Sequence, residues 1–164
     1  MSATRAVRIE RTFQAPVVKV FEAWTSEAVM RRWWQAEIGW ETSAAEVDLR
    51  VGGAVHVVMR DPDKDLEHGG GGYYTEIDRP TRLAFTWIWD GDTRRTLIEL
   101  DFEETGGVTT VSFTHSGLWD EAAVRSHEGG WGRIFDNLKR TLETARTDPK
   151  LDGPPGGAPR RRRR

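Results

Sequence analysis

The sequence contains no cysteine, so it can form no disulfide, thiolate nucleophile or cysteine-ligated zinc site. It has no apolar run near the roughly 20 residues that a membrane span requires. Its first residues, MSATRAVRIERTF, lack the apolar stretch of a secretory signal peptide. The hydrolase motifs GxSxG and HExxH are also missing. These absences predict a cytoplasmic protein with no membrane span.

Neither sign of charge is in large excess, because the net charge of the chain is only −2. From Asp148 onward there are six basic residues (Lys150 and Arg160–Arg164) and two acidic ones, which leaves −6 on the preceding part. A surface of that sign repels phosphate backbones, so we expect no nucleic-acid binding there. The Arg-rich end could make salt-sensitive contacts with nucleic acid or anionic lipid, and a solvated tail is the simpler interpretation.

Tryptophan is what the sequence has in abundance. Its eight tryptophans contribute a large part of the apolar area in a chain whose hydrophobic content is only 37%. A chain of 164 residues suits one domain, and a chain of this size can bury roughly two-thirds of its unfolded surface. We therefore expect a true core that is built from a few large side chains.

Hydrophobic periodicity predicts an α+β fold. Alternating segments indicate about seven strands, at residues 5–13, 46–51, 54–59, 73–77, 82–89, 96–102 and 108–115. In the second of these, Val47, Leu49 and Val51 lie on one face of the expected strand. Pro16 and Ser26 are placed to begin two short helices after the first strand. The tight turns between the later strands predict an antiparallel meander.

A single apolar stripe from Val124 to Ala145 predicts a long C-terminal helix that covers the sheet. We expect one domain over residues 1–147 and a disordered, Pro-, Gly- and Arg-rich tail over 148–164. Gly129, Gly130 and Gly132 interrupt the helix, and each interior glycine costs about 1 kcal/mol relative to alanine. Our hypothesis is that they widen the mouth of a cavity or mark a helix break near residue 129.

The segment DPDKDLEHGGGG (61–72) has acidic residues at alternate positions, as a calcium loop does. Such a loop needs glycine at its sixth position and glutamate at its twelfth, where this chain has Leu66 and Gly72. The glycines are not followed by Lys-Ser/Thr, so no phosphate-binding loop is present. We interpret 61–72 as a flexible hairpin loop that could gate a pocket, and we expect no metal or other cofactor.

Several stretches together resemble the START-like, or SRPBCC, superfamily, and within it the branch named after the activator of heat-shock-protein ATPase. They are RTFQAPVVKVFEAWT (11–25), VGGAV (51–55), GGYYTEIDRPTRLAFTW (71–87), FTHSGL (113–118) and SHEGGWGRIFDNLKRTL (126–142). The resemblance covers roughly residues 5–146. It implies a helix-grip fold, in which a curved antiparallel sheet wraps around the C-terminal helix and encloses a mostly apolar pocket.

The predicted site lies between sheet and helix. Trp87 and Trp89 share a strand face, as do Phe113 and His115 on a later strand. If both faces point inward, they line a pocket or form ordinary core. The expected pocket wall is Met59, Tyr74, Trp87, Trp89, Phe113, His115 and Trp131. Tyr74 and His115 would orient a small apolar or aromatic ligand.

Two other functions stay open at this point. A cyclase- or hydrolase-like enzyme would use His115 as its acid or base, because the unperturbed pKa of histidine lies near neutrality. Such an enzyme needs a partner, for which Glu76 and His127 are available by placement, although His127 more simply packs at the helix start. A chaperone co-factor, active in a stress response, would instead use the outer surface. The oligomeric state is also open, with a homodimer as one option.

Overall fold

The computed structural model describes residues 5–147, and the tail predicted over 148–164 lies outside the described residues. The elements follow the chain as β1 (Ala6–Phe13), α1 (Val17–Thr25), α2 (Glu27–Trp33), β2 (Glu41–Val47), β3 (Ala54–Asp61), β4 (Leu66–Asp78), β5 (Arg82–Trp89), β6 (Thr96–Thr105), β7 (Val108–Ser116) and α3 (Glu121–Thr147). This is the predicted order of one strand, two short helices, a meander and a long helix. No helix in the described range is long and apolar enough to cross a membrane.

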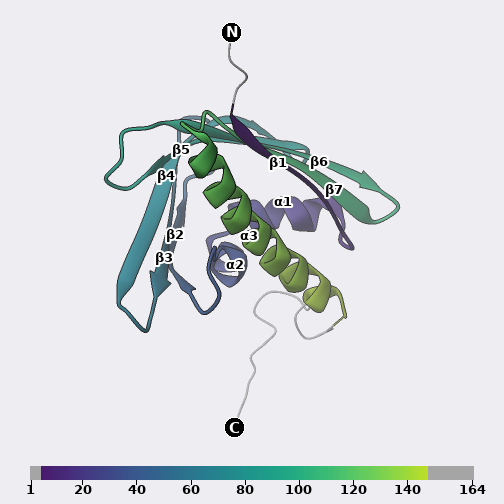
Figure 1. Cartoon of the computed structure of the whole chain (residues 1–164). Helices are drawn as coiled ribbons and strands as arrows, with labels where there is room; N and C mark the ends of the chain where they lie inside the picture. The colour runs from purple at the N-terminus through teal and green to yellow at the C-terminus, as the bar shows by residue number, and fades with distance from the viewer. Residues whose placement is uncertain (1–4, 148–164) are drawn as a thin grey trace.

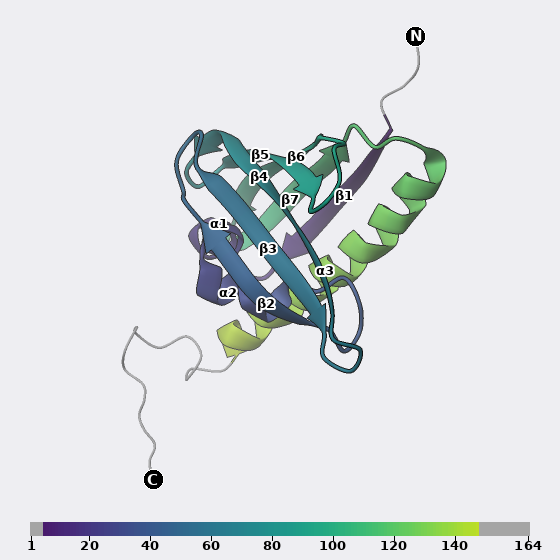
Figure 2. The ribbon, with the colours of Figure 1, turned by 90° about the vertical axis from the view of Figure 1, so that its left-hand side faces the viewer.

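The strands form one antiparallel sheet in the order β1-β7-β6-β5-β4-β3-β2. From β2 to β7, strands that are adjacent in the chain are also adjacent in the sheet, and β1 returns to pair with β7. Helices α1 and α2 therefore connect one edge of the sheet to the other. The sheet bends into a trough whose inner side holds the three helices (Figure 1), and the view from the β2–β3–β4 side shows those strands in front of the helices (Figure 2). The helix-grip prediction is confirmed.

Aromatic side chains fill the middle of the trough. Trp24 of α1 meets Trp33 of α2 edge to face, with 4.6 Å between ring centroids. Trp24 also lies 5.7 Å from Phe135 of α3, so all three helices contribute to one cluster. Ser26 separates α1 from α2 and caps α2 by accepting a hydrogen bond from the amide of Val29. Of the two alternatives that the sequence left open, pocket or ordinary core, this middle part of the interior is core.

The second strand differs from its prediction, because β2 spans Glu41–Val47 and residues 48–53 form a turn. The amide of Asp48 donates to the Ala54 carbonyl, and that of Gly53 donates to the Arg50 carbonyl. Gly52 has a φ of +86°, a conformation that favours glycine. Val51 consequently lies outside the strand and is 62% exposed. The alternation of apolar and polar residues thus extends past the end of the strand into a segment that these hydrogen bonds fold into a turn.

The flexible loop predicted over 61–72 is also wrong, since β4 begins at Leu66 and its glycines pair with strands on both sides. Gly70 lies opposite Val57 of β3 and opposite Trp89 of β5. A Cβ on Gly72 would lie 2.0 Å from the Thr86 carbonyl oxygen, and one on Gly70 would lie 2.7 Å from Cζ2 of Trp87. The glycines therefore serve close packing inside a strand.

Candidate functional site

A cleft of about 700 Å³ opens between the ends of β3, β4 and β5 and the N-terminal half of α3. Its remaining walls come from the α2–β2 connection, the β3–β4 hairpin, the β5–β6 connection and the segment before α3. The volume lies within the roughly 300–1,000 Å³ that is usual for small-molecule sites. Within residues 5–147, no cluster of histidine and acidic side chains is arranged to hold a metal ion.

Indole rings dominate the cleft. Six of the eight tryptophans line it: Trp34, Trp40, Trp87, Trp89, Trp119 and Trp131. Trp34, at the end of α2, stacks on Trp87 of β5 with 5.6 Å between centroids and meets Trp131 of α3 edge to face at 5.5 Å. Trp34 therefore closes the deep end, where sheet and helix would otherwise be separated. The result is an aromatic lining in which neighbouring rings meet both face to face and edge to face.

His127 holds one of these indoles in place. The Nε1–H of Trp89 donates to Nε2 of His127 at 3.0 Å, and Nδ1 of His127 lies 2.7 Å from the Ala123 carbonyl oxygen. Because Nε2 accepts, the proton must be on Nδ1, which donates to that carbonyl. Burial lowers the pKa of His127 from its ordinary value. The side chain is therefore neutral and acts as a support for Trp89.

His115 supports a second indole from beneath the cleft. Its Nδ1 accepts a hydrogen bond from Nε1–H of Trp131 at 3.0 Å, and its Nε2 lies 2.7 Å from Oγ1 of Thr96. The Thr96 hydroxyl donates to the Trp87 carbonyl, so Nε2–H of His115 is the donor to Thr96. Burial, together with nearby His127, lowers the pKa of His115 to about 3. Both ring nitrogens are occupied, and the side chain has no solvent exposure.

Strands β2–β7, the residues that line the cleft and most of α3 lie within one continuous stretch of sequence that a family model matches. Residues 14–143 match the family model described as Activator of Hsp90 ATPase homolog 1-like protein. The chain belongs to this family. As an AHSA1-like protein it falls within the SRPBCC superfamily, as its motifs predicted.

Solved structures of other AHSA1-like and related proteins have the same fold. An AHSA1-like protein from Aeromonas hydrophila is 29% identical, with a TM-score of 0.74 over 87% of this chain and 95% of that one. A protein from Chromobacterium violaceum is 22% identical, with a TM-score of 0.78 over 85% and 98%. One from Mycobacterium smegmatis is 20% identical, with a TM-score of 0.72 over 86% and 90%. A comparison with curated proteins finds no match.

In this AHSA1-like chain, four of the seven predicted site residues line the cleft: Met59, Trp87, Trp89 and Trp131. Tyr74, Phe113 and His115 lie in the core instead. The Tyr74 ring packs on Phe85, its hydroxyl has no hydrogen-bond partner among the described residues, and burial raises its pKa. Phe113 lies 4.6 Å from Trp131 and 5.2 Å from Phe135. All three face inward, but other side chains separate them from the cleft.

Glu76 and His127 are the residues that the sequence offered as acid–base partners of His115, and the structure places both. His127 lies beside His115, with 5.1 Å between ring centroids. It lines the cleft as well, rather than only packing at the start of the helix. Glu76 is exposed and pairs with Arg82, which Glu99 and Asp101 also hold. Glu76 therefore takes no part in the site.

Sequence reasoning missed three of the six cleft indoles. Helical spacing places Trp34 only on the apolar face of the second short helix, and Trp40 and Trp119 lie in connections, where periodicity predicts nothing. A signal was available, since a tryptophan in a connection exposes a large apolar ring unless a neighbouring element covers it. Which element covers each ring depends on the fold.

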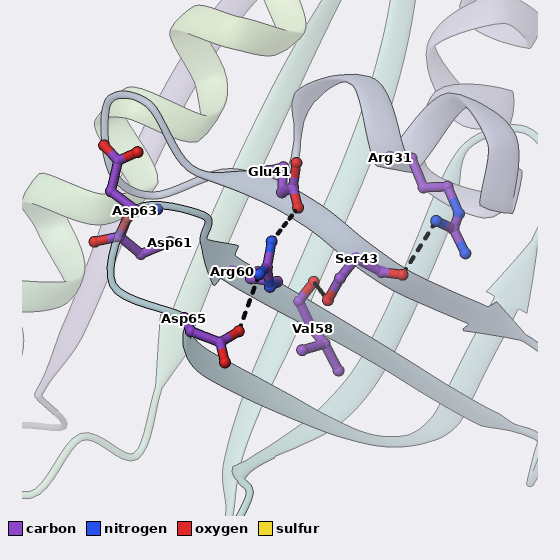
Figure 3. A network of polar contacts seen from close by, with 8 residues as sticks. All are labelled: Arg31, Glu41, Ser43, Val58, Arg60, Asp61, Asp63 and Asp65. Carbon is purple, nitrogen blue, oxygen red and sulfur yellow. Dashed lines mark hydrogen bonds and ion pairs between the residues drawn. The ribbon is translucent and has the colours of Figure 1, made fainter.

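The rim of the cleft is polar. The Arg94 guanidinium carbon lies 3.7 Å from the Trp119 ring centroid, and the same group pairs with Asp92 at 2.6 Å. Arg94 holds the pKa of Asp92 well below its usual range. His68 stacks on Trp89 with 4.1 Å between centroids. At the β3–β4 hairpin, Arg60 bridges Glu41 and Asp65, and no drawn contact joins it to Asp61 (Figure 3).

Proposed function

We propose that this AHSA1-like protein binds a small aromatic or apolar molecule in the tryptophan-lined cleft. The observation that carries the proposal is the convergence of six indoles from four separate segments on a space of about 700 Å³. Burial of a planar apolar ligand against them would gain roughly 25 cal/mol for each Å² removed from water. Stacked and edge-to-face ring contacts add to this gain.

The hydrogen bonds behind the walls support the proposal. Trp89 is held by His127, and Trp131 by His115, so neither ring must be ordered when a ligand arrives. A wall that is already fixed saves the cost of immobilising side chains, which is about 0.5–1.5 kcal/mol for each flexible one. The two histidines thus favour binding through the rings that they orient.

The enzyme alternative, a cyclase or hydrolase that uses His115, receives no such support. An acid or base must reach the proton that it transfers, directly or through one water. His115 is fully buried, both of its nitrogens are committed to hydrogen bonds, and it is neutral across the physiological range. This geometry favours a positioning role for the residue.

Calorimetric titration with the neutral probe 1-naphthalenemethanol tests the proposal. We expect saturable binding with one site per chain and quenching of tryptophan fluorescence. Trp40→Ala removes one indole from the connection before β2 and should weaken binding about tenfold, through lost ring contact and lost burial. Tyr73→Ala is the matched control, because this ring is 60% exposed and does not line the cleft.

Two results would count against ligand binding in the cleft. One is the absence of heat and quenching up to millimolar probe, and the other is equal weakening by both variants. A chaperone co-factor, the role that the family description suggests, would act through the outer surface and would not need the cleft. For that role, association with a heat-shock ATPase should survive Trp40→Ala unchanged.

A further inference from the structure

We propose that the cleft selects a cationic ligand, an aromatic or apolar amine, over a neutral or anionic ligand of the same shape. This inference rests on the proposed ligand-binding function and adds the charge of the ligand to it. Three features of the described residues carry it: the charge balance of the lining, the orientation of Asp61 and a cation that already rests on one of the indoles.

Carboxylates outnumber cations around the cleft. The lining contains Glu37, Asp61, Asp90 and Asp92 against Lys64 and Arg94, a balance of −2. Two histidines also line it, but burial lowers the pKa of both His68 and His127, so neither adds positive charge at neutral pH. The potential inside a partly enclosed cleft of this sign favours cations.

Strand alternation directs Asp61 toward the cleft. Met59 and Asp61 are two residues apart on β3 and share its inner face, whereas Arg60 between them lies on the outer face. There Glu41 and Asp65 occupy the Arg60 guanidinium (Figure 3). Within residues 5–147, neither Asp61 nor Glu37 has an ion-pair partner. A ligand cation would meet carboxylates that the protein has not neutralised.

The wall already holds one cation in the way that a ligand would be held. The guanidinium of Arg94 lies over the Trp119 ring at 3.7 Å and binds the carboxylate of Asp92. Indole faces attract cations through their quadrupole, and the attraction grows as water is excluded. The Asp61 carboxylate accepts a hydrogen bond from the amide of Asp63 through Oδ1, but among the described residues neither it nor Glu37 pairs with a protein cation. The other indoles and these two carboxylates offer the same two interactions to a ligand ammonium group.

Three naphthalene probes of similar shape test the inference: the cation 1-naphthylmethylammonium, the neutral alcohol 1-naphthalenemethanol and the carboxylate anion 1-naphthaleneacetate. At low salt we expect the ammonium probe to bind about fivefold tighter than the alcohol, and the carboxylate probe to bind weaker than the alcohol. The preference should shrink in 1 M salt, where charges are screened beyond roughly 3 Å. Calorimetry measures all three affinities on the full chain.

Asp61→Asn should remove most of the preference for the ammonium probe, measured as the ratio of its affinity to the affinity of the alcohol for the same variant. Glu67→Gln is the matched control, since it deletes one negative charge on the same hairpin from an exposed residue that does not line the cleft. Glu37→Gln serves as a second variant if Asp61→Asn does not fold, as judged by its unfolding midpoint.

The outcomes separate this inference from the function on which it rests. If the alcohol binds and the ammonium probe binds no tighter, charge selection is overturned and ligand binding stands. If the control variant abolishes the preference as fully as Asp61→Asn does, the preference comes from net charge rather than from the cleft, and the inference also fails. If no probe binds, the proposed function itself is overturned.

Discussion

His115 and His127 are neutral side chains whose main work is to orient indoles. Each accepts an indole N–H with one nitrogen and donates with the other, so each serves a tryptophan of the cleft wall. Protonation of either ring would turn its acceptor nitrogen into a donor and break the bond to the indole. At the residue scale, binding and stability are therefore linked to pH.

The stability of the fold should fall with pH below the ordinary histidine pKa of 6.5 because of His115. Its pKa is lowered in the folded state, so below pH 6.5 the unfolded chain takes up a proton that the folded chain does not. Stability therefore declines from about pH 6.5 toward the folded value of about 3. When the pH falls from 7.5 to 5, the unfolding free energy of the unchanged protein should drop by about 2 kcal/mol more than that of the His115→Gln variant.

Urea unfolding at a series of pH values measures this difference. Glutamine can accept from Trp131 and donate to Thr96, so the variant retains the geometry without the titration. Parallel pH profiles for the two proteins would show that His115 is not the buried neutral group described here.

Two elements are rich in glycine for opposite reasons. In β4, the inner face presents Gly70 and Gly72, where a side chain would collide with Trp87 or with the backbone of β5. In α3, a Cβ on Gly132 would meet nothing within 4 Å, and one on Gly129 would meet only the Arg133 side chain at 3.8 Å. The strand needs its glycines for packing, whereas these two helix positions have no such requirement.

Alanine at positions 129 and 132 should therefore stabilise the protein. Each replacement should gain about 1 kcal/mol of unfolding free energy through helix propensity alone. Affinity for the neutral probe should not change, because neither residue lines the cleft. Denaturant unfolding and calorimetry provide the two measurements, and a loss of affinity in the double variant would restore the cavity-mouth hypothesis for these positions.

The same chemical change in β4 should have the opposite effect. Gly70→Ala places a methyl group 2.7 Å from Cζ2 of Trp87, so the indole must move. We expect a loss of about 1–3 kcal/mol in unfolding free energy, as for other overpacked cores, together with weaker probe binding. Stability equal to that of the unchanged protein would mean that Trp87 has room to shift.

The hypothesis that the glycines mark a break in the C-terminal helix is wrong. α3 is continuous from Glu121 to Thr147, so there is no break near residue 129. Of the three glycines, Gly130 lines the cleft, and a Cβ there would lie 3.4 Å from that of Ala36. The cavity-mouth role therefore fits Gly130 alone, where α3 passes close to the α2–β2 connection.

At the scale of the whole molecule, the trough is filled unevenly. Helices α1 and α2 bring Trp24, Trp33 and Trp34 to its middle, and this cluster makes the centre solid. The cleft remains to one side, where the ends of β3–β5 extend past the cluster and face α3. The overall fold thus explains why a protein with so many tryptophans still has an open site.

The sequence by itself determined the fold class, the strand order along the chain and the family. Alternation and helical spacing are local properties that report which face of an element is buried, and the turn residues delimit most strands. The same local patterns placed Trp87 with Trp89, and Phe113 with His115, on shared strand faces. They failed where a pattern ran into a turn, at Val51, and where glycines packed within a strand, at Gly69–Gly72.

Only the tertiary structure decided which inward residues reach the cleft. Phe113 and Trp87 have similar local patterns and are equally buried, yet Trp131 and Phe135 cover the first, while the second borders the cleft. Trp40 and Trp119 lie in connections without periodicity, so their place in the wall depends on how distant elements pack. A cleft is the space that remains between elements after packing, and no single segment of sequence contains that information.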